Sequence, residues 1–92
     1  MIKSFRHKGL KLLFESGDHR GVPTHMASRI IRRLDAVDAA AVATDLNLPG
    51  FDLHPLKGDR KGTWSLRISA NYRITFGFRG GDAFDVDLED YH

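Results

Sequence analysis

Beyond residue 5, the hydrophobic period changes once along this chain of 92 residues, from helical spacing to strict alternation. Up to about residue 41, apolar residues recur every three or four positions, which predicts a short helix over about 7–16 and a longer one over about 26–41. Alternation of apolar and polar residues, interrupted by turn residues, predicts an edge strand over 2–5 and antiparallel strands over 64–68, 72–78 and 83–88.

Two helices followed by a meander of three or four strands indicate a small α+β domain. We expect the two N-terminal helices to pack on one face of an antiparallel β-sheet and the other face to stay open. No repeat or linker divides the chain, so residues 1–92 are expected to form a single domain. The predicted core consists of apolar residues from the long helix and the first hairpin, namely Ile30, Leu34, Trp64, Leu66, Ile74 and Phe76.

The composition excludes several classes of protein. The chain has no cysteine, so disulfide scaffolds, thiolate metal sites and cysteine nucleophiles are ruled out. No His, Asp and Glu set has metal-ligand spacing, and no nucleotide-binding glycine motif is present, so we expect no metal and no cofactor. No signal peptide and no apolar run long enough to cross a bilayer is visible, which favours a cytoplasmic protein that does not contact membranes.

Charge is distributed unevenly along the chain. Residues 1–33 carry eight Lys and Arg against two acidic residues, residues 54–73 are also basic, and residues 82–90 carry five acidic residues. Such a chain can present a basic face to a polyanion, with nucleic acid the first candidate. The alternative is that the charges only solvate helix faces and pair across strands.

Two arginines are predicted to share the open face of the sheet. If Trp64, Leu66 and Ile68 face the core, Arg67 faces outward, and the same alternation displays Arg73 on the next strand. A pair of guanidinium groups on one face suits the binding of a phosphate. The alternative is that each is neutralised by the acidic last strand, through Asp85, Asp87 or Glu89.

A meander also brings the last strand's end beside this hairpin. Asp90, Tyr91 and His92 would then lie near the arginines, together with His54 and Lys57 from the segment before the hairpin. RNA cleavage without a metal needs a base for the ribose 2′-hydroxyl, cations for the charged transition state, and an acid for the leaving 5′-oxygen. These residues supply all three groups, with the assignment of base and acid left open.

The chain resembles the HigB-type toxins of the RelE/ParE superfamily of bacterial toxin–antitoxin systems. The resemblance covers nearly the whole chain, including its first residues, Met1 to Phe5. Its other parts, which are specific only when taken jointly, are Leu53-His54-Pro55-Leu56-Lys57-Gly58-Asp59-Arg60, Trp64-Ser65, Asn71-Tyr72-Arg73-Ile74-Thr75-Phe76 and Glu89-Asp90-Tyr91-His92.

The resemblance implies a RelE-like, microbial ribonuclease-type fold and a ribosome-dependent endoribonuclease that cuts mRNA in the decoding site. Asn71 is implied to lie near the codon bases, and Arg67 is expected to bind substrate, although some relatives carry that arginine at the position of Ser69. The catalytic positions implied by the resemblance are His54, Lys57, Arg73, Asp90, Tyr91 and His92.

The implied partners are the bacterial ribosome with its mRNA and a HigA-like antitoxin with a helix-turn-helix domain, through which alone operator DNA would be contacted. We expect the outer faces of both helices to contact rRNA phosphates through Lys8, Lys11, Arg29, Arg32 and Arg33. Two alternatives stay open, a ParE-like toxin that poisons a topoisomerase and a nucleic-acid-binding module without catalysis.

Overall fold

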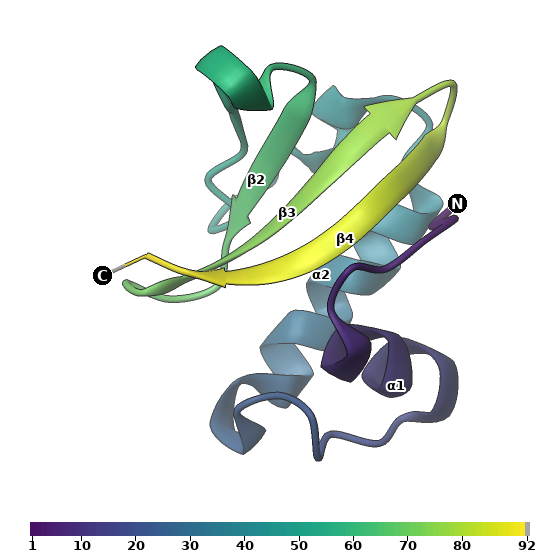
Figure 1. Cartoon of the computed structure of the whole chain (residues 1–92), viewed down its shortest axis with the longest axis vertical. Coiled ribbons are helices and arrows are strands. Elements are labelled where there is room, and N and C mark those ends of the chain that lie inside the picture. The colour runs from purple at the N-terminus through teal and green to yellow at the C-terminus, as the bar shows by residue number, and fades with distance from the viewer. Residues whose placement is uncertain (92) are drawn as a thin grey trace.

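The computed structural model describes residues 1–91, and it has two α-helices packed against a single antiparallel sheet (Figure 1). The helical elements are α1 (Lys8–Ser16), η1 (Thr24–Met26), α2 (Ala27–Ala39), η2 (Ala43–Leu46) and η3 (Gly58–Arg60). The strands are β1 (His54–Pro55), β2 (Thr63–Arg67), β3 (Tyr72–Arg79) and β4 (Asp82–Asp90). This confirms the predicted α+β class and arrangement.

Local signals explain where the helices begin and end. The His7 side chain caps α1 by accepting a hydrogen bond from the Leu10 amide at 3.1 Å, and Gly17 ends the helix in a left-handed conformation. The longer helix α2 ends at Ala39, slightly before the predicted end, because Ala40 is already extended. Within residues 1–91, no helix is long and apolar enough to span a membrane.

The core fills the space between α2 and the covered face of the sheet. Ile30, Leu34, Leu66 and Ile74 are fully buried, Phe76 is 1% exposed, and Trp64 packs against them while half-buried. The pairs Trp64–Phe76 and Leu66–Ile74 lie opposite each other in the β2–β3 ladder. The predicted core is therefore confirmed.

A bulge interrupts β4, so the prediction of unbroken alternation over 83–88 is wrong. The register slips between Thr75 and Gly77, and opposite this point Asp85 has a left-handed backbone with φ 54°. The extra residue lets both Ala83 and Val86 face the core. The predicted N-terminal strand forms only two isolated parallel bridges beside this bulge, Ile2–Ala83 and Phe5–Val86.

Candidate active site

The open face of the sheet carries a polar row built by strand register. His54 lies opposite Ser65, and Ser65 lies opposite Thr75, while two residues further along β2 Arg67 lies opposite Arg73. Paired residues in a ladder share one face, and these residues lie on the face that the helices do not cover. The prediction that Arg67 and Arg73 share this face is confirmed.

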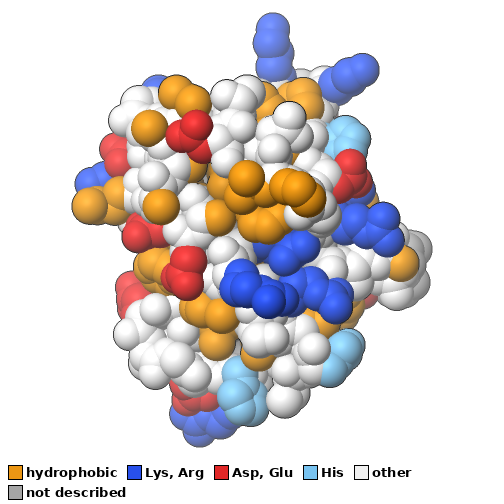
Figure 2. Space-filling view, turned by 180° about the vertical axis from the view of Figure 1, so that it is seen from behind, with side chains coloured by type: hydrophobic (Ala, Val, Ile, Leu, Met, Phe, Trp, Pro, Cys, Tyr) orange, Lys and Arg blue, Asp and Glu red, His pale blue; other side chains and the backbone are white. Residues whose placement is uncertain are grey.

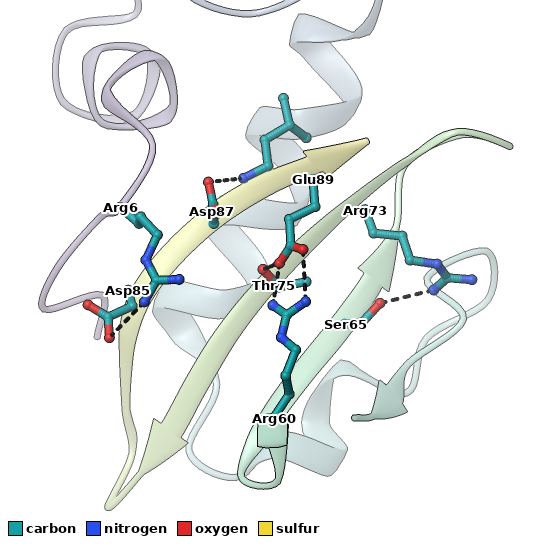
Figure 3. Close-up of polar contacts among 9 residues, drawn as sticks. Arg6, Arg60, Ser65, Arg73, Thr75, Asp85, Asp87 and Glu89 are labelled. Atoms are coloured by element: carbon teal, nitrogen blue, oxygen red, sulfur yellow. Dashed lines mark hydrogen bonds and ion pairs between the residues drawn. The ribbon is translucent and has the colours of Figure 1, made fainter. Parts of the chain in front are cut away.

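Arg73 is held in place by two side chains, and its contact with Ser65 is drawn in Figure 3. Its Nη1 donates to the Ser65 hydroxyl at 3.0 Å, and its Nη2 donates to the Asp52 carboxylate at 3.2 Å. The Tyr91 ring lies 6.0 Å from the centre of the guanidinium group. With only 23% of its side chain exposed, Arg73 is a preorganised cation that still faces solvent on one side.

His54 is oriented by Asp52, two residues earlier. Its Nδ1 lies 2.9 Å from the Asp52 carbonyl oxygen and 3.5 Å from a carboxylate oxygen of the same residue. Because a carbonyl oxygen can only accept, this hydrogen bond places the proton of a neutral imidazole on Nδ1. The Nε2 atom then carries the lone pair that a general base needs.

These side chains meet in an open groove of about 410 Å³. The groove combines an imidazole, an ammonium group, a guanidinium group and a phenol, which suits an anionic substrate with protons to transfer. Its lining residues are His54, Pro55, Leu56, Lys57, Ser65, Arg73 and Tyr91. The structure thus brings together four of the six predicted catalytic residues.

The other predicted residues lie around the groove or outside it. Asp90 lies opposite Tyr72 in the ladder, and this register puts it on the other face of the sheet from Arg73. Asn71 is exposed in the β2–β3 turn, where its carbonyl accepts from the Tyr91 amide. Arg67 is exposed on the open face, and His92 lies outside the described residues.

The acidic last strand does not neutralise Arg73 in the way that the alternative interpretation required. Glu89 instead forms a bidentate ion pair with Arg60 and also accepts a hydrogen bond from Thr75 (Figure 3). The Arg60 hydrogen bond lowers the pKa of the Glu89 carboxyl, against the opposing effect of burial, and the same bond raises the pKa of Arg60. Glu89 of the last strand therefore holds the η3 loop through Arg60, and the carboxylate that pairs with Arg73 is that of Asp52.

The basic helix residues divide into two groups. Lys8, Lys11 and Arg32 are exposed, and Arg29 is exposed while donating to the Ile68 carbonyl at 2.8 Å. Arg33 is buried, so its prediction as a surface contact to rRNA is wrong: the loop before β1 returns across α2 and covers it. Lys and Arg side chains still gather in a band beside a hydrophobic patch on the face seen in Figure 2.

Sequence reasoning missed Asp52, Ser65 and the Arg60–Glu89 pair. Ser65 could have been found from strand alternation, because residues two positions apart in a strand share one face and Ser65 therefore shares the face of Arg67. Asp52 lies in the turn after Leu48-Pro49-Gly50, and no spacing rule connects it to Arg73. Within residues 1–91, no group of three potential metal-ligating side chains comes together.

Comparisons with known proteins show the family to which this chain belongs. Residues 3–92 match the family described as RelE-like toxin of type II toxin–antitoxin system HigB. The chain is 56% identical to Endoribonuclease HigB of Proteus vulgaris over the full length of both chains. It is 32% identical over 91 residues to Toxin HigB-1 of Vibrio cholerae, covering 97% of this chain and 96% of that protein.

Solved structures support the fold. The YoeB–YefM complex from Staphylococcus aureus contains a chain similar to all of this one, with a TM-score of 0.64, 16% identity and 95% of that chain covered. YafQ from E. coli matches 98% of this chain and 91% of its own, with a TM-score of 0.59 and 14% identity. Both likenesses show that this chain shares its fold of helices and an antiparallel sheet with these proteins.

Proposed function

Because this chain belongs to the HigB family of RelE-like toxins of type II toxin–antitoxin systems and is an endoribonuclease, we propose that it cuts mRNA held in the decoding site of the bacterial ribosome. The observation that carries the proposal is the convergence of His54, Lys57, Arg73 and Tyr91 on one open groove. An open groove can receive an RNA strand that another molecule holds in place. The ribosome would hold the mRNA in this way.

The proposed chemistry is attack of a ribose 2′-hydroxyl on the adjacent phosphorus. His54 Nε2 takes the proton of the hydroxyl, since the Asp52 carbonyl holds the other ring nitrogen as a donor. The new bond joins the 2′-oxygen to phosphorus, and the bond from phosphorus to the 5′-oxygen breaks. The products are a 2′,3′-cyclic phosphate and a 5′-hydroxyl.

The cations of the groove stabilise the charge that develops during this attack. Arg73 has donors on both Nη atoms, and the Ser65 and Asp52 contacts fix where its guanidinium group lies. Lys57 also lines the groove and adds a second positive charge. Preorganised donors of this kind are typically worth about 10²–10³ in rate.

The leaving 5′-oxygen needs a proton. The Tyr91 phenol lines the groove on the side of Arg73, and we assign it this role, with Asp90 and His92 as its neighbours in the chain. All roles in the reaction are then filled by side chains of this protein. Arg67 and Asn71 would contact the nucleotides on either side of the cut from the β2–β3 hairpin.

As a toxin of a toxin–antitoxin system, the protein has an antitoxin partner, and we propose a HigA-like antitoxin with a helix-turn-helix domain. Operator DNA would be contacted only through that antitoxin. Since ribosomes are cytoplasmic, we propose that the toxin acts in the cytoplasm. The exposed cations Lys8, Lys11, Arg29 and Arg32 would contact rRNA phosphates.

Addition of the purified protein to a translating extract tests the proposal. Mapping of mRNA ends should show breaks at defined codons in translated messages and none after the ribosomes are removed by sedimentation. Equal cutting of free RNA would contradict ribosome dependence. Arrest of DNA supercoiling without RNA breaks would instead support a ParE-like topoisomerase poison, and RNA binding without either effect would support a module without catalysis.

A further inference from the structure

Arg33 is a buried cation whose hydrogen bonds go to backbone carbonyls. The residue is 9% exposed, and its guanidinium donates to the carbonyls of Arg67 at 2.8 Å, Gly50 at 3.1 Å and Arg29 at 3.5 Å. Its central carbon also lies 4.6 Å from the centre of the Phe51 ring. Burial and the nearby Arg29 and Arg32 charges lower the pKa of Arg33, so the protein keeps this charge against a desolvation penalty.

The groups that Arg33 joins are the loop before β1 and the end of β2. The loop is held to the strand by a further hydrogen bond, in which the Arg67 amide donates to the Phe51 carbonyl at 2.7 Å. Arg33 and this bond therefore fix Gly50 and Phe51 against the sheet. His54 follows three residues after Phe51, where β1 begins.

Between the fixed loop and His54 lies a strained residue. Asp52 has a left-handed backbone with φ 50°, a conformation that residues other than glycine seldom adopt. Such a conformation persists only where its surroundings impose it. The carbonyl that holds His54 Nδ1 belongs to this same residue, so the direction of the carbonyl depends on the loop being fixed.

We propose that Arg33 is a positioning residue for His54, acting through the Gly50–Phe51 loop to aim the Asp52 carbonyl that orients the imidazole. The proposal rests on the proposed function, because it gives His54 the role of base. A planar guanidinium group can reach three carbonyls in different directions and stack on Phe51 at the same time, whereas an ammonium group cannot. An apolar residue of similar size would fill the space but leave the Gly50 and Arg67 carbonyls without this donor.

The direct test is the tautomer of His54 in the free protein. Imidazole ¹⁵N–¹H correlation spectra at alkaline pH distinguish a neutral ring with its proton on Nδ1 from one with its proton on Nε2. The wild type should show mainly the Nδ1–H form for His54, assigned by comparison with His54→Gln. In Arg33→Lys the signal should move towards a mixture of the two forms, while the other histidines keep their signals.

Cleavage on programmed ribosomes gives the second readout. At saturating ribosome concentration, Arg33→Lys should lower the single-turnover rate roughly 10- to 100-fold, the size expected for a misplaced reacting group, with little change in the half-saturating concentration. The matched control is Arg79→Lys, since Arg79 also lies over an aromatic ring, that of Phe84 at 5.4 Å, but is exposed and far from the loop. The control should behave as wild type in both measurements.

A second variant keeps the test decisive if Arg33→Lys does not fold. Phe51→Leu removes the ring under the guanidinium and keeps every backbone group, and it should shift the His54 tautomer in the same direction. Folded variants with the wild-type His54 signal and a wild-type rate would overturn the positioning role. The spectra are recorded without RNA, so a wild-type protein that fails to cut mRNA would contradict the proposed function and leave the tautomer result to decide on Arg33.

Discussion

Arg67 and Arg73 lie directly opposite each other in the β2–β3 ladder, yet they occupy different environments. Arg73 is held by Ser65 and Asp52 and lines the groove beside His54. Arg67 is exposed, and its backbone serves as the anchor for Arg33 and Phe51. We therefore assign charge stabilisation to Arg73 and substrate binding to Arg67.

Replacement of each arginine by alanine tests this assignment. Arg73→Ala should lower the single-turnover cleavage rate by at least ~10²-fold, as expected for the loss of a preorganised donor. Arg67→Ala should mainly raise the half-saturating ribosome concentration. Thermal unfolding checks that both variants are folded, and equal rate losses in the two would contradict the division of roles.

The Arg60–Glu89 pair predicts a pH-dependent stability. Because the folded state lowers the pKa of Glu89 from its ordinary value of 4.5, the carboxylate stabilises the fold above that value, and this contribution is lost as the pH falls through the lowered pKa. Glu89→Gln should therefore cost roughly 1–3 kcal/mol near neutral pH, and the difference from wild type should shrink in acid. Urea unfolding at both pH values measures it, with Asp35→Asn, an exposed change on α2, as the control.

Phe76 tests the assignment of the sheet faces. Its ring is 1% exposed between the sheet and α2, so Phe76→Ala should cost about 3–5 kcal/mol in the free energy of unfolding. Phe84→Ala should cost clearly less, because the bulge at Asp85 leaves Phe84 half-buried on the open face. Denaturant unfolding of both variants gives the comparison, and similar losses would show that the faces are misassigned.

Periodicity predicted the layers of this fold because the helices and the strands β2 and β3 turn their apolar residues towards a single core. It could not predict the bulge, since one residue with a left-handed backbone at Asp85 reverses the parity of β4 without any glycine to mark the place. The placement of His54, Lys57 and Arg73 in one groove could be predicted because their chemistry is recognisable and the meander brings their segments together. The alternation of side chains between the two faces of the hairpin was enough to place Arg73 on the open face.

Arg33 and Asp52 show what periodicity leaves out. The helical spacing of α2 groups Arg33 with Arg29 and Arg32 on an outer face, but the loop around Gly50 and Phe51 folds back over Arg33 alone. The contact between Asp52 and Arg73 joins residues 21 positions apart, and Asp52 lies in a loop outside the helices and strands. Both contacts depend on the path of that loop, which has no hydrophobic period to predict it.

Ribosome binding should depend on residues other than those that carry out cleavage. The reversal Lys8→Glu, Lys11→Glu and Arg32→Glu replaces three exposed cations and leaves the buried Arg33 in place. Because phosphate contacts add salt-screened affinity, the variant should bind ribosomes more weakly and with a smaller salt dependence. Sedimentation at several salt concentrations measures this, and a large loss of single-turnover rate at full occupancy would contradict the separation.

The central claim is that the groove directs a ribose 2′-hydroxyl at the neighbouring phosphorus of mRNA on the ribosome. The most direct measurement uses purified ribosomes programmed with a labelled mRNA, either unmodified or carrying a single 2′-O-methyl group at the nucleotide whose phosphate is cut. We predict a 2′,3′-cyclic phosphate end with the unmodified message and no break at that position with the methylated one. Cleavage of the methylated message at the same bond, at the wild-type rate, would contradict the account.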